Sequence, residues 1–465
     1  MIIIWGMAYM VYLFILGAAI RLLFWRHHDP RQTALTFTAH AFMTGVAIHI
    51  LLFNALQWLL NSPQYLVLTV SLLLVVALFW VVIAWRRYQP VIISKPRPTN
   101  LILGLVLLLF SVMMWQLGHW LPNLAWDSWT VWEGKANQWL HHGWSLDFAT
   151  LNSWLVNEDT LFNPSPAYPE GLPLLYYWPK LLTPHSLGAV HSVYLMAFAM
   201  TTWLLIQRLS QSHAPGYLLG LVVLVMYTTP LMSNHLIMQG YADIWVGMFL
   251  LLAILSLANY HQHPTTLNAL STLLYLLATT WFKLEGWAWV LTWSAAWVLV
   301  MIYRHRLRWV WLAMLLMLPL TVMLIGGFEW HTPLGDLVIT AERLTLFNLI
   351  DTPLQFTNVS SAVMASLLWQ NNWLLLWLAL PWVVILGPWQ LQTSHDRFAA
   401  LFMLLAVSSI LLLFYFTKAS QWAVDFTAIN RLWLQLTPVL IYLVFALLNG
   451  LPGVQKEPHQ TQLHS

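Results

Sequence analysis

The chain has 465 residues, of which 60% are hydrophobic and only 8% are charged. Soluble domains carry about 25% charged residues, so this composition excludes a soluble protein of this length. The formal net charge of +3 does not indicate a nucleic-acid partner, and the lack of cysteine excludes disulfides, thiolate metal sites and cysteine nucleophiles. The composition predicts a polytopic membrane protein, and the 31 tryptophans fit the preference of Trp for the membrane interface.

Hydropathy indicates thirteen segments that could cross a bilayer, each with about 20 mostly apolar residues. In chain order they are 2–24, 34–60, 66–85, 100–120, 186–207, 216–233, 244–260, 268–282, 286–303, 309–328, 363–387, 399–417 and 432–449. The pair 268–282 and 286–303 is short, which is also compatible with a re-entrant hairpin. We therefore expect an all-α fold with about 11–13 transmembrane helices.

Two long segments between the spans, at 122–185 and 329–362, divide the chain into the units expected below. We find no internal repeat and no separate soluble domain in the sequence. The expected units are N-terminal membrane helices (1–121), a first large extracytoplasmic loop (122–185), central membrane helices (186–328), a second extracytoplasmic loop (329–362), C-terminal membrane helices (363–449) and a cytoplasmic tail (450–465).

The charges indicate the orientation of the chain. If the loop after the first span is cytoplasmic, 13 of the 19 Lys and Arg residues are on the cytoplasmic side, as the positive-inside rule requires. Of the 16 acidic residues, 13 are then on the opposite side. This predicts a multi-pass protein of the inner (plasma) membrane, with a site that faces the periplasm or exterior.

The first large loop is expected to begin with an amphipathic helix at 127–142 that lies in the membrane interface. Asp127 stands at its start, where Asp is also a preferred N-cap residue. The prolines and glycines between 164 and 173 exclude a continuous helix there and are expected to form a rigid wall around Tyr168 and Glu170.

The second loop is expected to carry another interfacial helix at 336–350. Its apolar face would be built from Leu337, Ala341, Leu344 and either Phe347 or Ile350.

Further ionisable residues stand at the edges of later spans on the same predicted side: Asp243, Lys283, Glu285, Asp425 and Arg431. Ionisable side chains at membrane depth are costly, which makes them functional candidates. A local ion pair of Lys283 with Glu285, or a snorkelling role for Arg431, would also account for their positions. Together, the two cations suit a membrane-bound anion such as a lipid phosphate.

Five motifs in chain order resemble a known family. They are WDSWTVWEGKA (126–136), AYPEGLPLL (167–175), GYAD (240–243), KLEG (283–286) and NRLWLQLTP (430–438). This set is similar to bacterial integral-membrane glycosyltransferases of the GT-C fold, related to the dolichyl-phosphate-mannose protein mannosyltransferases and the lipid A aminoarabinose transferases. The likeness covers about residues 100–440. The chain departs from the family in having four spans before Asp127, Ala167 in place of an acid and Leu284 in place of Asn.

The resemblance implies a hexosyl- or pentosyltransferase of the cell envelope. Such enzymes move a sugar, with inversion, from a polyprenyl-phosphate donor to an acceptor lipid, glycan or protein, within the membrane lipids. Asp127 matches the family's catalytic Asp and would act as general base. The expected substrate-binding residues are Glu133, Lys135, Tyr168, Glu170, Asp243, Lys283, Glu285 and Arg431.

Three questions stay open from the sequence alone. The carboxylates could hold Mg²⁺ or Mn²⁺, and no metal ligand is assigned. A polysaccharide polymerase or ligase is an alternative, although the first loop is acidic rather than basic. A lipid or solute transporter is a second alternative, although it would place charges in the middle of spans and show repeat symmetry.

Overall fold

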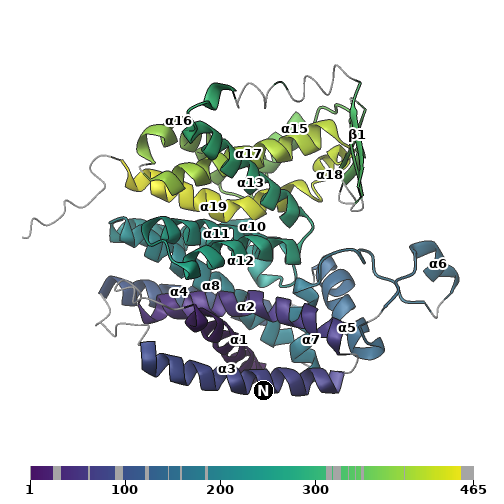
Figure 1. The fold of residues 1–465 in the computed structure, drawn as a ribbon, viewed down its shortest axis with the longest axis vertical. Helices are drawn as coiled ribbons and strands as arrows, with labels where there is room; N and C mark the ends of the chain where they lie inside the picture. Colours follow the sequence, from purple (N-terminus) through teal and green to yellow (C-terminus); the bar gives the residue numbers. More distant parts are fainter. Residues whose placement is uncertain are drawn as a thin grey trace, which may run out of the picture.

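The protein is a bundle of long helices, seen from the side in Figure 1. The computed structural model describes residues 2–24, 33–60, 63–88, 98–120, 125–144, 146–157, 160–183, 187–310, 317, 326–332, 335–340, 342–346, 350–391 and 393–451. Within the described part, nine helices are long and apolar enough to cross a membrane. The α9 and α10 pair makes a tenth if the two count as one span bent by 61°. The predicted all-α polytopic membrane fold is confirmed.

The first half of the bundle contains the following elements: α1 (Ile2–Leu23), α2 (Ala34–Leu59), α3 (Pro63–Tyr88), α4 (Pro98–Trp120), the π-helical turn η1 (Ser128–Trp132), α5 (Glu133–His142), α6 (Leu151–Val156), α7 (Gly171–Leu182), α8 (Leu187–Gln211), α9 (Gly216–Thr228) and α10 (Pro230–Ile237). The bend between α9 and α10 falls at Thr229 and Pro230, because proline lacks the N–H that would continue the helix.

The second half contains α11 (Asp243–Gln262), α12 (Thr266–Phe282), α13 (Glu285–Arg304), α15 (Ser360–Met364), the short helices η2 (Ala365–Trp369) and η3 (Leu376–Leu378), α16 (Ala379–Gln390), α17 (Ser394–Phe416), α18 (Ser420–Val424) and α19 (Ile429–Asn449). Between α13 and α15 lies a four-stranded sheet of β1 (Phe328–Thr332), β2 (Gly335–Ile339), β3 (Arg343–Leu346) and β4 (Ile350–Pro353).

Helices α11 and α19 form the centre of the bundle. They pack against each other, and α11 also packs against α8 and α12. Both are buried along most of their length, whereas α3 and α4 expose most of their apolar side chains at the periphery. Because α11 begins at Asp243 and α19 begins two residues before Arg431, this packing brings two predicted site residues to the same end of the bundle.

Two sequence predictions about the second half are wrong. The segment 336–350 is not an interfacial helix, because β2, β3 and the start of β4 pair there as an antiparallel meander. The segment 363–387 is not one span. Its helix ends at Trp369 and resumes at Leu376. Polar residues interrupt it: the side chain of Gln370 accepts hydrogen bonds from Asn430 and Asn372, and the carbonyl oxygen of Asn372 accepts one from the backbone of Leu231. The span predicted at 309–328 lies largely outside the described residues.

Close contact between α1 and α2 depends on two glycines. A Cβ on Gly17 would lie 1.8 Å from the carbonyl oxygen of Ala41, and a Cβ on Gly45 would lie 1.8 Å from that of Leu13. Small residues allow this kind of close backbone approach between membrane helices.

We therefore expect Gly45→Ala to destabilise the protein by about 1–3 kcal/mol, the usual effect of overpacking. Gly220→Ala in α9 is the matched control, because nothing lies within 4 Å of its added Cβ. Alanine is the better helix former, so the control should be neutral or stabilising. Thermal unfolding in detergent measures both, and equal melting temperatures would contradict the close contact.

Candidate functional site

Five segments that are far apart in the sequence meet at one end of the bundle. They are the start of η1 with Asp127, the turn before α7 with Tyr168 and Glu170, the link before α11 with Tyr241 and Asp243, the α12–α13 turn with Lys283 and Glu285, and the start of α19 with Arg431. In Figure 1 this is the end where α5 and α7 lie. The meeting point follows from helix packing, because each residue stands at or next to the end of a helix.

Asp127 and Arg431 form an ion pair across the cluster. The Oδ2 atom of Asp127 accepts a hydrogen bond from Nη1 of Arg431. Asp127 has helical backbone angles and its side chain makes no capping bond to η1, so the capping interpretation is not supported by this structure. The side chain of Asp127 is 15% exposed and that of Arg431 is 30% exposed. A substrate can therefore reach both partners.

A second ionic group lies deeper. Nζ of Lys283 is 2.9 Å from Oδ1 of Asp243 and 3.2 Å from Oε1 of Glu285. Gln435 donates to the same Asp243 oxygen at 2.7 Å, and Trp289 donates to Gln435 at 2.6 Å. Asp243 and Lys283 are almost fully buried, whereas Glu285 is one-third exposed. Burial disfavours the Lys283 ammonium, but the two carboxylates outweigh it and raise the pKa of Lys283 above its usual value.

Two tyrosines flank these ion pairs. The ring of Tyr168 stacks on Trp132 with centroids 5.3 Å apart, and Nζ of Lys283 is 5.9 Å from its centroid. The guanidinium carbon of Arg431 is 5.2 Å from the ring centroid of Tyr241. Burial raises the pKa of Tyr168, which also responds to the charges of Lys283, Glu285, Asp243 and Asp127. Both ionic groups therefore act on Tyr168, so they belong to one cluster.

Glu133 and Lys135 are placed differently. Each is buried on α5 and holds a neighbouring segment. Glu133 pairs with Lys180 of α7 at 2.8 Å. Lys135 lies 3.5 Å from Glu170 and donates to the carbonyl oxygens of Pro166 and Tyr168. Burial lowers the pKa of Lys135, and the Glu170 carboxylate opposes that shift.

These contacts fix the turn that carries Tyr168, so they favour a positioning role for Glu133 and Lys135. Glu170 remains one-third exposed and within reach of a substrate. Asp425, in contrast, is exposed and bonds to Thr427 in its own turn, so the structure does not bring it into the cluster.

The structure explains why the GYAD motif begins with glycine. Gly240 has φ of +104°, and a Cβ there would lie 1.9 Å from Oγ of Ser128. Only glycine combines this backbone conformation with so close an approach. The link before α11 therefore packs directly on the residue that follows Asp127.

Comparison with known proteins gives no significant match to a family model, a curated protein or a solved structure. The resemblance to GT-C glycosyltransferases therefore rests on the five motifs.

Sequence reasoning missed two residues of the cluster, Tyr241 and Gln435. Both lie inside the motifs, and each had a signal. Gln435 is one helical turn after Arg431, so it faces the same side of α19, and a polar amide in a membrane helix needs a partner. Tyr241 immediately follows the glycine of GYAD, next to the bundle end.

The described carboxylates do not resemble a metal centre. Within the described part of the chain, no group of three or more His, Asp or Glu residues could hold a metal ion. Asp127 and Asp243 are instead each paired with a cationic side chain.

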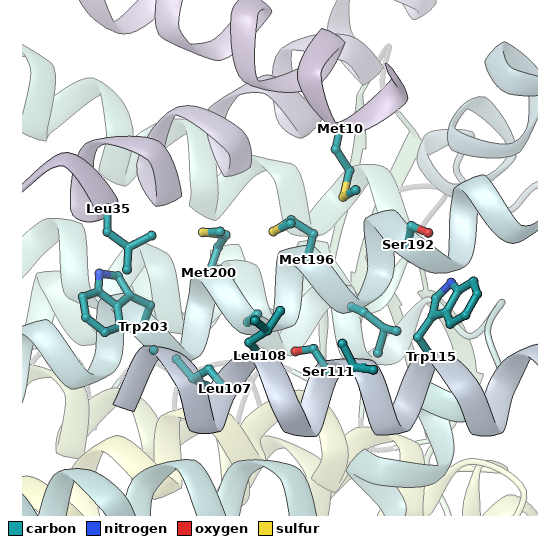
Figure 2. A pocket seen from close by; sticks show the side chains of 14 residues that line it. Met10, Leu35, Leu107, Leu108, Ser111, Trp115, Ser192, Met196, Met200 and Trp203 are labelled. Carbon is teal, nitrogen blue, oxygen red and sulfur yellow. The ribbon is translucent and has the colours of Figure 1, made fainter. Parts of the chain in front are cut away.

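An apolar cavity of about 300 Å³ lies within the bundle, between α1, α2, α4 and α8 (Figure 2). Methionine and leucine side chains dominate its lining, and Ser111 and Ser192 add the only hydroxyls. Ser192 follows His191, whose ring bonds to the carbonyl oxygen of Leu236 in α10. Helix α10 is followed by Gly240 and Asp243, so helix α8, which lines the cavity, also packs against the segment that leads to the ionic cluster.

Proposed function

We propose that this protein is a GT-C-type glycosyltransferase that moves a sugar, with inversion, from a polyprenyl-phosphate donor to an acceptor hydroxyl. The observation that carries the proposal is the reachable Asp127–Arg431 pair beside the buried Asp243–Lys283 pair at one end of a membrane bundle. A base and a phosphate-binding cation in one place are what this reaction needs.

The proposed step begins when the donor phosphate enters the site. The phosphodiester attracts the Arg431 guanidinium, which presents a fork of donors suited to phosphate oxygens. Asp127 then loses its ion-pair partner, and its carboxylate oxygens become available to the acceptor hydroxyl. The pair thus keeps Asp127 occupied until the donor is bound.

In the transfer itself, the acceptor oxygen attacks C1 of the sugar from the side opposite the phosphate. The new C1–O bond forms as the bond from C1 to the phosphate oxygen breaks. The acceptor proton moves to Asp127, and polyprenyl phosphate leaves with both electrons of the broken bond. Arg431 stabilises the second negative charge that develops on this phosphate.

The remaining residues support this step. Lys283 lies too deep for direct contact with a substrate, so we assign it to the positioning of Asp243 and Glu285. Glu170 and Glu285 are exposed enough to accept hydrogen bonds from sugar hydroxyls. The rings of Tyr168 and Tyr241 offer faces for the sugar ring.

The cavity between α1, α2, α4 and α8 supports a lipid-linked donor. Its apolar lining suits a hydrocarbon chain that lies within the membrane bundle. The asymmetry of basic residues supports an extracytoplasmic site in the inner (plasma) membrane. A periplasmic or exterior glycan, lipid or protein would then be the acceptor.

Transfer from a panel of polyprenyl-phosphate sugars, with protein in liposomes, tests the proposal. We expect Arg431→Gln to raise the KM for the donor by about 10-fold or more, since charge-assisted bonds to phosphate are worth about 1.5–3 kcal/mol. Arg343→Gln is the matched control, because Arg343 is exposed and pairs only with Asp351 in the sheet among described residues. Release of polyprenyl phosphate and its dependence on donor concentration give the KM.

An Arg431→Gln variant with unchanged donor KM would contradict the role of Arg431. Failure of the unaltered protein to release polyprenyl phosphate from any donor of the panel would contradict the function itself.

A further inference from the structure

The small sheet β1–β4 has two chemically different faces, which the strand register defines. Residues directly opposite each other in paired strands point to the same face. Phe328 pairs with Ile339, and Trp330 pairs with Leu337. Ile339 pairs in turn with Leu344. These five side chains therefore share one face, which we call the apolar face of the sheet: Phe328, Trp330, Leu337, Ile339 and Leu344.

The other face carries the charges. His331 lies 2.8 Å from Asp336, and Arg343 lies 2.7 Å from Asp351. All four side chains are more than half exposed, and Glu329 stands on the same face. Hydrated ion pairs of this kind belong in water. The charged face therefore points to solvent, and the apolar face points the opposite way.

The apolar face is uncovered. Trp330 is 56% exposed, Phe328 is 38% exposed and Ile339 is 37% exposed. In the described part of the chain, the four strands contact mainly one another rather than a helix. Contiguous exposed apolar surface of this sort marks an interaction site.

The position of the sheet identifies what can cover it. Just after β4, the backbone N–H groups of Gln355 and Thr357 donate to the carbonyl oxygens of Phe416 and Tyr415, at the last turn of the membrane-length helix α17. Phe356, between them, is 63% exposed and packs against both aromatic rings.

Only Leu354 separates Pro353 from the attachment at Gln355, and extended chain covers about 3.3 Å per residue, so the sheet stays close to the end of α17. Figure 1 shows the strands lying across the long helices, beyond α15 and α18. The sheet is therefore held where a span leaves the bilayer, in the orientation of the membrane surface.

We propose that the apolar face of the β1–β4 sheet lies on the lipid surface of the bilayer, at the end of the bundle that carries Asp127 and Arg431. Trp330 and Phe328 are of the aromatic type that gathers at the headgroup level. The charged face then meets water, and the sheet acts as an interfacial platform beside the site. This inference does not depend on the proposed transfer reaction.

The chain has no cysteine, so single cysteines can report each face directly. The test uses Ile339→Cys on the apolar face and Glu329→Cys on the charged face, each labelled with bimane in phosphatidylcholine vesicles. Some vesicles carry a nitroxide on a lipid acyl carbon near the headgroup. Trp330→Cys provides a second apolar-face position if Ile339→Cys folds poorly.

We expect lipid nitroxide to quench the label at Ile339→Cys about fivefold more than at Glu329→Cys, since interfacial elements bury ~5–10 Å into the headgroup region. A membrane-impermeant thiol reagent should react faster with unlabelled Glu329→Cys. Equal quenching and equal reaction at the two positions would overturn the proposal. Protection of Ile339→Cys without lipid quenching would also overturn it, because a second copy or another protein would then cover the face.

Discussion

Asp127→Asn is expected to lower sugar transfer by about 10²-fold or more, the usual contribution of a general base. Asparagine keeps the shape of the side chain and an oxygen for the Arg431 guanidinium, but it cannot take the acceptor proton. Because the Asp127–Arg431 pair is partly exposed, its loss should change the free energy of unfolding by no more than about 1 kcal/mol. The variant should therefore fold, bind the donor and fail in the transfer step.

The assay compares kcat and the donor KM of Asp127→Asn with those of Asp147→Asn. Asp147 belongs to the same loop and is exposed, so its substitution removes a carboxylate without touching the cluster. The control should retain full activity. Full activity in the Asp127→Asn variant would show that another group takes the proton, and the assignment of Asp127 would be wrong.

Much of the cluster could be predicted because charge is rare in this chain. With 35 ionisable Lys, Arg, Asp and Glu residues in 465, a few acids and cations at span edges on one side stand out. The sequence indicated the local Lys283–Glu285 pair, which forms at 3.2 Å, but it could not predict the pairs between distant segments. These depend on how α11, α12 and α19 pack, and this packing joins Asp243 to Lys283 and leaves Arg431 for Asp127.

The sequence pattern also could not predict which of the charged side chains are buried. Glu133 was expected to bind the substrate, yet it is buried and paired with Lys180. The partner stands 47 positions later, on α7, and helical periodicity carries no information about such a contact.

The sheet shows how one pattern can favour the wrong structure. Leu337, Ala341 and Leu344 fit the spacing of a helix face, but Leu337 and Ile339 also alternate with Asp336 and Val338 as a strand requires. Pairing with β1 and β3 decides between these readings, and a single segment does not reveal its partners. Short segments of this kind are the least certain to predict from periodicity.

Lys283→Met is expected to destabilise the protein by about 3–5 kcal/mol, because it leaves the buried Asp243 carboxylate without its nearest cation. Among the described residues, the 2.7 Å hydrogen bond from Gln435 would then be the one remaining polar contact of the Asp243 side chain. The melting temperature in detergent measures this loss. The matched control is Lys418→Met, which removes a cation at the same end of the bundle. Among the described residues, no carboxylate lies within ion-pair distance of Lys418.

The double variant Lys283→Met with Asp243→Asn separates stability from function. Asparagine can still accept from Gln435, and no uncompensated charge remains buried, so most of the lost stability should return. Transfer should nevertheless stay at least about 10-fold below that of the unaltered protein, because Glu285 loses the ammonium that holds it in place, and a small misplacement of active-site groups can cost about 10²-fold. If the double variant recovered both its melting temperature and its full activity, the buried pair would serve folding alone.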